Sequence, residues 1–99
     1  ATLSLRAANV NSEAALEQRC VAYAKKHGCV LLKIQGAMGW PDRLCLMPGG
    51  KGFFIEFKAP GQGLRPKQKA VQAMLDGLGF GCFEVDNRHL FERLLNERL

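Results

Sequence analysis

Residues 39–61 read GWPDRLCLMPGGKGFFIEFKAPG, and they predict the central hairpin of the fold. Two apolar runs, residues 43–47 and 53–58, flank a glycine-containing turn, which is the pattern of a β-hairpin. Asp42 stands just before the first run, and Glu56 and Lys58 stand near the end of the second. Strand side chains alternate faces, so Glu56 and Lys58 share one face about 7 Å apart. The start of the first strand lies beside the end of the second, and the sequence therefore predicts that Asp42 is close to both.

The rest of the chain supplies the elements around this hairpin. Helical periodicity and caps indicate three helices, and β-rich runs indicate two more strands. Ser12 or Asn11 can cap the first helix, Gly28 follows its end, and Pro66 opens the second. We expect a single domain over residues 1–99, with a core of about 12–86 and a C-terminal helix over 87–99. The order α-β-β-β-α-β-α predicts an α/β fold with a mixed four-stranded sheet flanked by helices. The expected helices and remaining strands are 12–27, 29–34, 66–79, 80–85 and 87–99.

Composition narrows the classes of protein that this chain can belong to. Apolar residues make up 47% of the 99 residues, which is typical of a globular domain. No apolar run approaches the roughly 18 residues of a membrane helix, so we expect no membrane partner and a cytoplasmic location. The net charge of +5 favours a polyanionic partner, nucleic acid first. The four cysteines form no C-x-x-C pair, and neither His27 nor His89 completes a zinc site, so we expect buried reduced thiols.

The predicted meeting of Asp42 and Glu56 has a chemical consequence. Two carboxylates in one site repel each other unless a cation lies between them, and carboxylate oxygens suit a hard cation such as Mg²⁺. The alternative is a plain Glu56–Lys58 ion pair at the edge of a sheet. Glu13, in the middle of the apolar face of the first helix, is either a third carboxylate facing this site or a first-turn acid that complements the helix dipole.

Two further polar residues lie near the same helix faces. We expect Glu17 to neighbour or partner the site, and the choice between Glu13 and Glu17 as the residue facing the metal stays open. Gln68 lies close to the apolar stripe in the first turn of its helix. It either reaches the same site or caps its helix in solvent.

These residues carry a resemblance to a known family. Pro41-Asp42, followed after thirteen residues by Glu56-Phe57-Lys58, resembles the PD-(D/E)xK nuclease motif. The wider string of ExxLE from Glu13, Gly28, Lys33, GxPDRLxLxPGG, FIEFKAPG and LRPKQ resembles the VRR-NUC family, the virus-type replication-repair nucleases. The resemblance covers about residues 12–86 and implies a restriction-endonuclease-like core. One departure is Arg65, a poor N-cap where many members have Ser or Thr.

The resemblance also implies roles for these residues. Asp42 and Glu56 would hold Mg²⁺ or Mn²⁺, with Glu13 directly or through water and with the backbone carbonyl of Phe57. Lys58 would orient or deprotonate the attacking water. Gln68 would position Lys58 or the water. The product would be a phosphodiester cut in DNA.

The expected substrate is branched DNA such as Holliday junctions or flaps. A restriction-type endonuclease and a non-catalytic nucleic-acid-binding module are the alternatives. Trp40, beside Asp42, either stacks on an unpaired base or packs at the edge of the core. Six basic residues border the predicted site, and we expect them to contact phosphates. They are Lys33, Arg43, Lys51, Arg65, Lys67 and Lys69.

The last expectation concerns assembly. The apolar residues of the C-terminal helix and of the N-terminal TLSL segment predict a homodimer that uses that helix, the N-terminal arm or both. The alternative is that both ends simply cover the core of one protomer. For a phage-encoded protein, the predicted location is the cytoplasm of the host cell.

Overall fold

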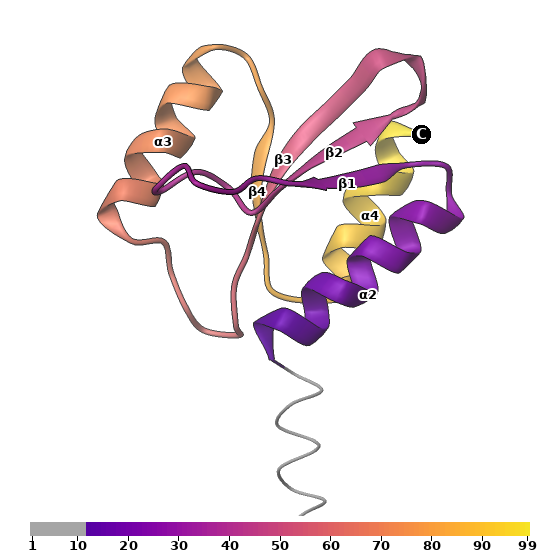
Figure 1. The fold of residues 1–99 in the computed structure, drawn as a ribbon, viewed down its shortest axis with the longest axis horizontal. Helices are drawn as coiled ribbons and strands as arrows, with labels where there is room; N and C mark the ends of the chain where they lie inside the picture. Colours follow the sequence, from indigo (N-terminus) through magenta and orange to yellow (C-terminus); the bar gives the residue numbers. More distant parts are fainter. Residues whose placement is uncertain (1–11) are drawn as a thin grey trace, which may run out of the picture.

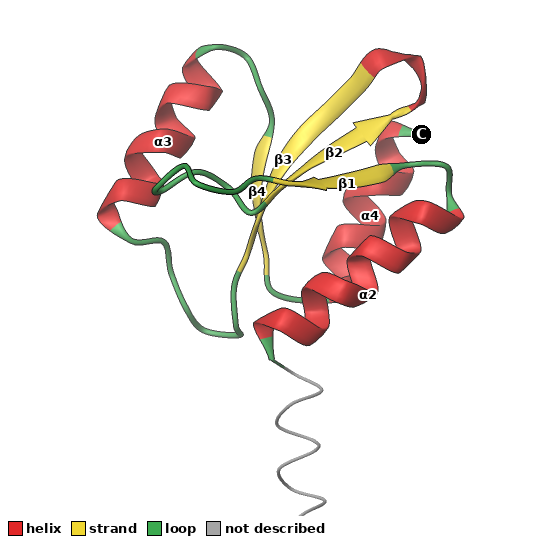
Figure 2. Ribbon diagram, in the orientation of Figure 1, coloured by secondary structure: helices red, strands yellow, loops and turns green. Residues whose placement is uncertain are grey.

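A computed structural model describes residues 12–99, so the predictions made for the N-terminal arm and for Asn11 as a cap lie outside the described residues. The described elements follow the predicted order, joined by short loops and one 3₁₀ turn (Figures 1 and 2). They are α2 (Glu13–Lys26), β1 (Val30–Lys33), β2 (Arg43–Met47), η1 (Pro48–Gly50), β3 (Lys51–Phe57), α3 (Pro66–Gly77), β4 (Cys82–Val85) and α4 (Arg88–Arg98).

The four strands form one mixed sheet in the order β1-β2-β3-β4. β1, β2 and β3 run as an antiparallel meander, and β4 returns parallel to β3 after the crossover through α3. The register of the hairpin pairs Arg43 with Ile55, which sets the start of β2 beside the end of β3. The predicted α/β fold with a mixed four-stranded sheet is therefore confirmed.

The two faces of the sheet are covered differently. α2 and α4 lie side by side on one face, and α3 lies on the other (Figure 1). The core between the sheet and the α2–α4 pair contains the fully buried Phe53, Ile55 and Phe57 of β3. A smaller cluster under α3 joins Val71 and Leu75 to the sheet. The central strand β3 is thus covered on both faces, which explains why its sequence is a continuous apolar run.

Local signals explain where the helices begin. The Ser12 hydroxyl accepts a hydrogen bond from the Ala15 N–H at 3.2 Å, and the Asn87 side chain does the same for the Leu90 N–H at 2.8 Å. Both are N-caps that satisfy a free amide of the first turn. α3 begins at Pro66, whose missing N–H is no loss at a helix start.

The C-terminal helix is used inside the protomer. Its apolar residues Phe91, Leu94 and Leu95 are buried in the main core, and only Leu99, 52% exposed, remains on the surface. These buried side chains are not available to a partner, because they fill the space beside α2. The structure therefore supports the alternative for this helix, that it covers the core of one protomer. None of the helices described over residues 12–99 has the length and apolar character needed to span a membrane.

Candidate active site

Asp42 is held at the mouth of the hairpin by the backbone on either side of it. Its carbonyl accepts a hydrogen bond from the Ile34 N–H at 2.9 Å, and its Oδ2 accepts one from the Phe57 N–H at 2.8 Å. The second bond ties the carboxylate to the end of β3, one residue from Glu56. The predicted approach of Asp42 to the Glu56–Lys58 pair is thus present in the structure.

Glu56 and Lys58 are buried, at 6% and 7% exposure. Lys58 lies just beyond the end of β3, where its N–H donates to the Val85 carbonyl at 2.9 Å and extends the pairing with β4. Burying a charged side chain is costly unless polar partners replace its water. A partner for Lys58 is Gln68, whose Oε1 accepts a hydrogen bond from Nζ at 2.9 Å.

Gln68 also explains how α3 begins without a conventional cap. The same Oε1 accepts the backbone N–H of Arg65 at 2.8 Å, which is the returning half of a capping box. Arg65 occupies the N-cap position, and Gln68 compensates for its poor capping ability. One amide oxygen therefore fixes the helix start and the Lys58 ammonium together.

The electrostatics of the site are dominated by its two close carboxylates. Burial raises the pKa of Glu56 to about 8, and the charge of Asp42 and a hydrogen bond with it act in the same direction. Lys58 opposes this shift, while Glu13 adds slightly to it. A pair of acids that shares a proton in this way is a site that a cation would stabilise in its fully ionised form.

These residues line one cavity of about 450 Å³. Glu13 from the first turn of α2 reaches it, whereas Glu17 does not: Glu17 Oε2 pairs with Arg43 Nε at 2.7 Å and with Lys33 Nζ at 3.4 Å. The structure thus places Glu13, and not Glu17, at the pocket. Its lining also includes Gln62 and Gly63, which sequence reasoning missed because the loop after Lys58 has no periodicity. The lining residues are Glu13, Asp42, Glu56, Lys58, Gln62, Gly63, Arg65 and Gln68.

Two known proteins are similar to this chain. No family model matches the chain. The chain is 36% identical over 80 residues to a protein named "Putative nuclease p44" from Acyrthosiphon pisum secondary endosymbiont phage 1, a match that covers 79% of this chain and 86% of that protein. A solved structure described as "VRR_NUC domain" has a similar fold, with a TM-score of 0.75 and 22% identity, over 85% of this chain and 94% of that chain. The chain belongs to the same family as this phage protein, and it has the fold of a VRR_NUC domain.

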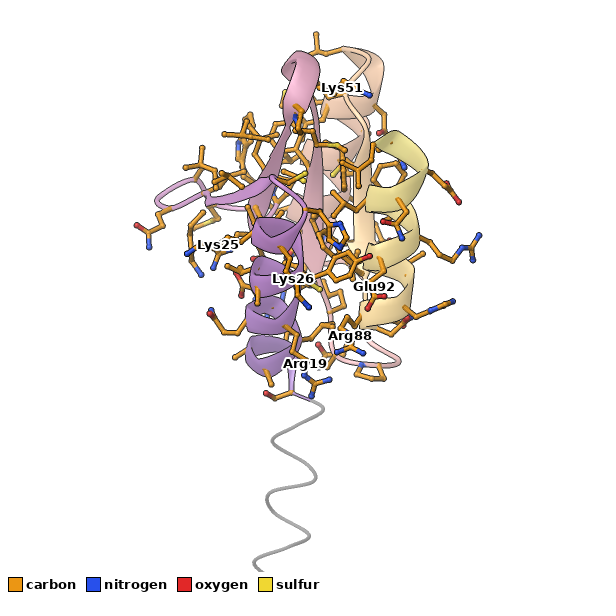
Figure 3. All side chains as sticks on the ribbon, turned by 90° about the vertical axis from the view of Figure 1, so that its right-hand side faces the viewer. Arg19, Lys25, Lys26, Lys51, Arg88 and Glu92 are labelled. Atoms are coloured by element: carbon orange, nitrogen blue, oxygen red, sulfur yellow. The ribbon has the colours of Figure 1, made fainter. Side chains whose placement is uncertain are left out.

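The predicted catalytic side chains of the resemblance line one pocket, but the predicted basic border does not surround it. Arg43 is engaged with Glu17 and with the Leu31 carbonyl, and its side chain is only 11% exposed. Lys51 donates to the Arg98 carbonyl at 2.7 Å. It lies at the end of the molecule opposite to the start of α2 (Figure 3). Lys33 is 49% exposed but pairs with Glu17.

Three of the six predicted basic residues do lie around the start of α3. Arg65 lines the pocket, and Arg65, Lys67 and Lys69 are all exposed. None of the ion pairs found among residues 12–99 engages them. The exposed positive charge near this pocket thus comes from the start of α3 and not from the β2–β3 hairpin.

The donor set of this pocket fits a divalent cation. Its acids are hard oxygen donors from three elements, and the Phe57 carbonyl lies between Glu56 and Lys58 in the chain. Among residues 12–99, no three acidic, histidine or cysteine side chains are already grouped as a metal-binding cluster. The fit therefore rests on the Asp42–Glu56 pair, with Glu13 at the wall of the same cavity.

Proposed function

We propose that this protein is a metal-dependent endonuclease that hydrolyses phosphodiester bonds in branched DNA, such as Holliday junctions or flaps. The observation that carries the proposal is the single pocket that joins Glu13, Asp42, Glu56, Lys58 and Gln68. The name of the similar phage protein, which describes a nuclease, supports the same reaction class. A phage protein that acts on DNA would work in the cytoplasm of the host cell.

Asp42 and Glu56 would hold Mg²⁺ or Mn²⁺, together with the Phe57 carbonyl and with Glu13 directly or through water. When bound, such an ion polarises the scissile phosphate, lowers the pKa of a coordinated water and stabilises the charge that develops in the transition state. The Phe57 N–H keeps one Asp42 oxygen oriented, because Oδ2 accepts its hydrogen bond. The second Asp42 oxygen would then be the one available to a cation and to Glu56.

Lys58 would supply the proton chemistry and part of the charge balance. Its ammonium is a three-proton donor, and Gln68 Oε1 accepts one of these hydrogen bonds. The remaining N–H groups are available to orient a water or a phosphate oxygen in the cavity. Gln68 acts as a positioning residue, since it also fixes the Arg65 N–H and so links the lysine to the start of α3.

Affinity for DNA would come from the exposed start of α3. Arg65, Lys67 and Lys69 are placed to contact phosphates, which gives binding without sequence readout. Lys33, Arg43 and Lys51 have protein partners in the structure, and we assign the main phosphate contacts to α3 instead.

We also propose that the active form is a homodimer, because two cuts in a junction need two sites related by symmetry. The buried face of α4 does not serve this purpose. The edge strand β1 exposes Val30 (57%) and Leu32 (49%) on the sheet face that carries Glu56, and among the residues that the structure describes this apolar surface is open to a second copy. Light scattering at micromolar concentration tests the assembly: a mass near 10.9 kDa with junction cutting intact would refute the dimer.

The experiment that tests the activity is a cleavage panel with Mg²⁺ or Mn²⁺. Junction, flap, duplex and single-stranded DNA of matched length are incubated with wild type, Glu56→Gln and Glu84→Gln. Glu84 pairs with Glu56 in the β3–β4 register but is exposed, so it is a matched control. We expect cutting of branched DNA that is lost in Glu56→Gln and kept in Glu84→Gln. Binding of DNA without cutting under any metal condition would leave a non-catalytic binding module.

A further inference from the structure

A row of three aromatic side chains lies on the α3 face of the sheet. Trp40 contacts Phe54 edge-to-face with 6.3 Å between ring centroids, and Phe54 contacts Phe80 in the same way at 5.9 Å. Trp40 is 37% exposed and Phe80 is 51% exposed, while Phe54 between them is half-buried. The central ring of the row is therefore partly buried, and the rings at its two ends are exposed to water.

The central ring of this row lies on the same strand face as the carboxylate pair. Phe54 and Glu56 are two residues apart on β3, so their side chains share one face at a separation of about 7 Å. That is about the rise of two stacked nucleotides. Trp40 is likewise two residues before Asp42. A nucleic-acid strand with one phosphate in the pocket thus has aromatic rings within reach of its neighbouring bases.

Positive charge lies beside the same row. Gly39 has a φ of 79° and packs its backbone directly against the Lys67 side chain, so the loop that carries Trp40 touches the start of α3. Only glycine suits this position, because a Cβ would collide with that side chain. Aromatic rings and cations side by side match the bases and phosphates of one strand.

We propose that Trp40, Phe54 and Phe80 form a stacking surface for unpaired bases of the strand whose phosphate enters the pocket, with Lys67 and Arg65 on its phosphates. The inference rests on the proposed nuclease function and names its substrate class, DNA with an unpaired strand next to the cut. Bases inside a duplex are already stacked on each other and cannot offer their faces to protein rings. The surface would therefore select unpaired strands without reading their sequence.

A protein partner is the competing occupant of this face. Leu44 and Leu46 lie beside Phe54 and Phe80 around a hollow of about 290 Å³, and an apolar hollow also suits another protein chain. The position of Phe54 two residues before Glu56, the lysine Lys67 beside the row and the lysine Lys51 that lines the hollow favour nucleic acid. A second copy bound here is an outcome that the experiment below would reveal.

Trp40 is the only tryptophan, so it reports on the row by itself. We would titrate the full-length protein with (dT)20 and with a 20-base-pair duplex, in Ca²⁺ to allow binding, checking that the DNA is recovered intact. We expect (dT)20 to quench the Trp40 fluorescence and the duplex to leave it nearly unchanged. Removing one stacking ring lowers affinity by about 5- to 150-fold.

Leucine substitutions separate stacking from general apolar packing. Trp40→Leu and Phe80→Leu keep an apolar side chain but remove the ring, and their DNA affinity is measured by anisotropy of labelled DNA. We expect (dT)20 binding to weaken about tenfold and duplex binding to stay the same, which also shows that the variants are folded. Leu78→Ala, at an apolar position that is 67% exposed at the end of α3, is the control and should bind (dT)20 like wild type.

Two results would overturn the proposal. One is unchanged (dT)20 affinity in both leucine variants. The other is a self-association that weakens when a charged residue replaces Phe80, with DNA affinity unaffected, which would assign the row to a second copy. Because binding is measured without cleavage, a failure here is distinct from a failure of the nuclease proposal, which is decided by the cleavage panel.

Discussion

Replacing Asp42 with asparagine should stabilise the metal-free protein while removing its response to metal. In the folded protein without metal, Glu56 has a pKa of about 8 against an ordinary 4.5, and so it takes up a proton on folding at pH 7. At about 1.4 kcal/mol per pKa unit, this uptake opposes folding by roughly 3 kcal/mol. Burial is the largest cause and remains in the variant, whereas the charge of Asp42 does not.

The expected gain from Asp42→Asn is therefore about 1–2 kcal/mol at pH 8. The asparagine oxygen can still accept the Phe57 N–H, and its amide can donate to Glu56 in place of the repelling charge. For a domain of this size, such a gain raises Tm by roughly 5–10 °C. Because the folded-state pKa of Glu56 is raised, the contribution of this group to stability is fully present below about pH 4.5 and is lost as the pH rises toward 8.

Thermal melts in EDTA between pH 5 and 8 measure this effect, followed by melts in Mn²⁺. Wild type should lose stability as the pH rises and recover it with Mn²⁺, because a ligand at 100 times its Kd adds about 2.7 kcal/mol. Asp42→Asn should show a flatter pH profile and little response to Mn²⁺. Glu84→Gln, which changes an exposed carboxylate, should follow wild type in both respects. A variant that is less stable than wild type at pH 8 in EDTA would refute the reasoning.

Three further predictions concern neighbouring groups. Lys58→Ala should abolish cutting while metal and DNA affinities stay near wild type, and normal turnover in that variant would show that the lysine is only a structural partner. Gln68→Ala should lower the free energy of unfolding by about 2–3 kcal/mol and change kcat more than KM, because the Lys58 ammonium and the Arg65 N–H both lose their hydrogen-bond acceptor. The control Gln72→Ala, which loses one hydrogen bond to the Cys82 carbonyl, should lower stability without changing kcat. Burial raises the pKa of the Cys20 and Cys45 thiols to about 12. A disulfide reagent at pH 8 should therefore modify these thiols slowly in the folded protein and rapidly in urea. Fast labelling of the folded protein would contradict the assignment of buried thiols.

The hairpin was predictable because its constraints are local. Strand alternation and the turn at residues 48–50 are enough to bring Asp42 beside Glu56 and Lys58, and the observed register agrees with that geometry. The same reasoning could have excluded Lys51 from the site. Lys51 begins β3 and Glu56 is next to the last residue of that strand, so the two lie at opposite ends of β3.

No local sequence signal could decide whether Glu13 or Glu17 faces the pocket. Both face the sheet side of α2 and are one helical turn apart, so periodicity cannot separate them. The packing of α2 against the sheet separates them, because Glu17 forms ion pairs with Arg43 and Lys33, whereas Glu13 lines the pocket. The sequence also could not show whether the apolar residues of α4 face the core or a partner. Only the packing of α4 beside α2 shows that they belong to the core.

The strand β3 shows how a domain of this size can carry both a stable core and a site. Its Phe53, Ile55 and Phe57 face the α2–α4 layer and are fully buried, so this face supplies the apolar burial that holds the sheet. The alternate side chains, Phe54 and Glu56, face the thinner α3 layer. That layer buries little apolar surface, and so a carboxylate pair and a half-exposed aromatic row can be accommodated there without taking residues from the main core. Alternate residues of β3 thus serve different purposes, because one face packs the main core and the other carries the site. Substitutions on the α3 face should therefore change function with smaller losses of stability than substitutions on the α2–α4 face.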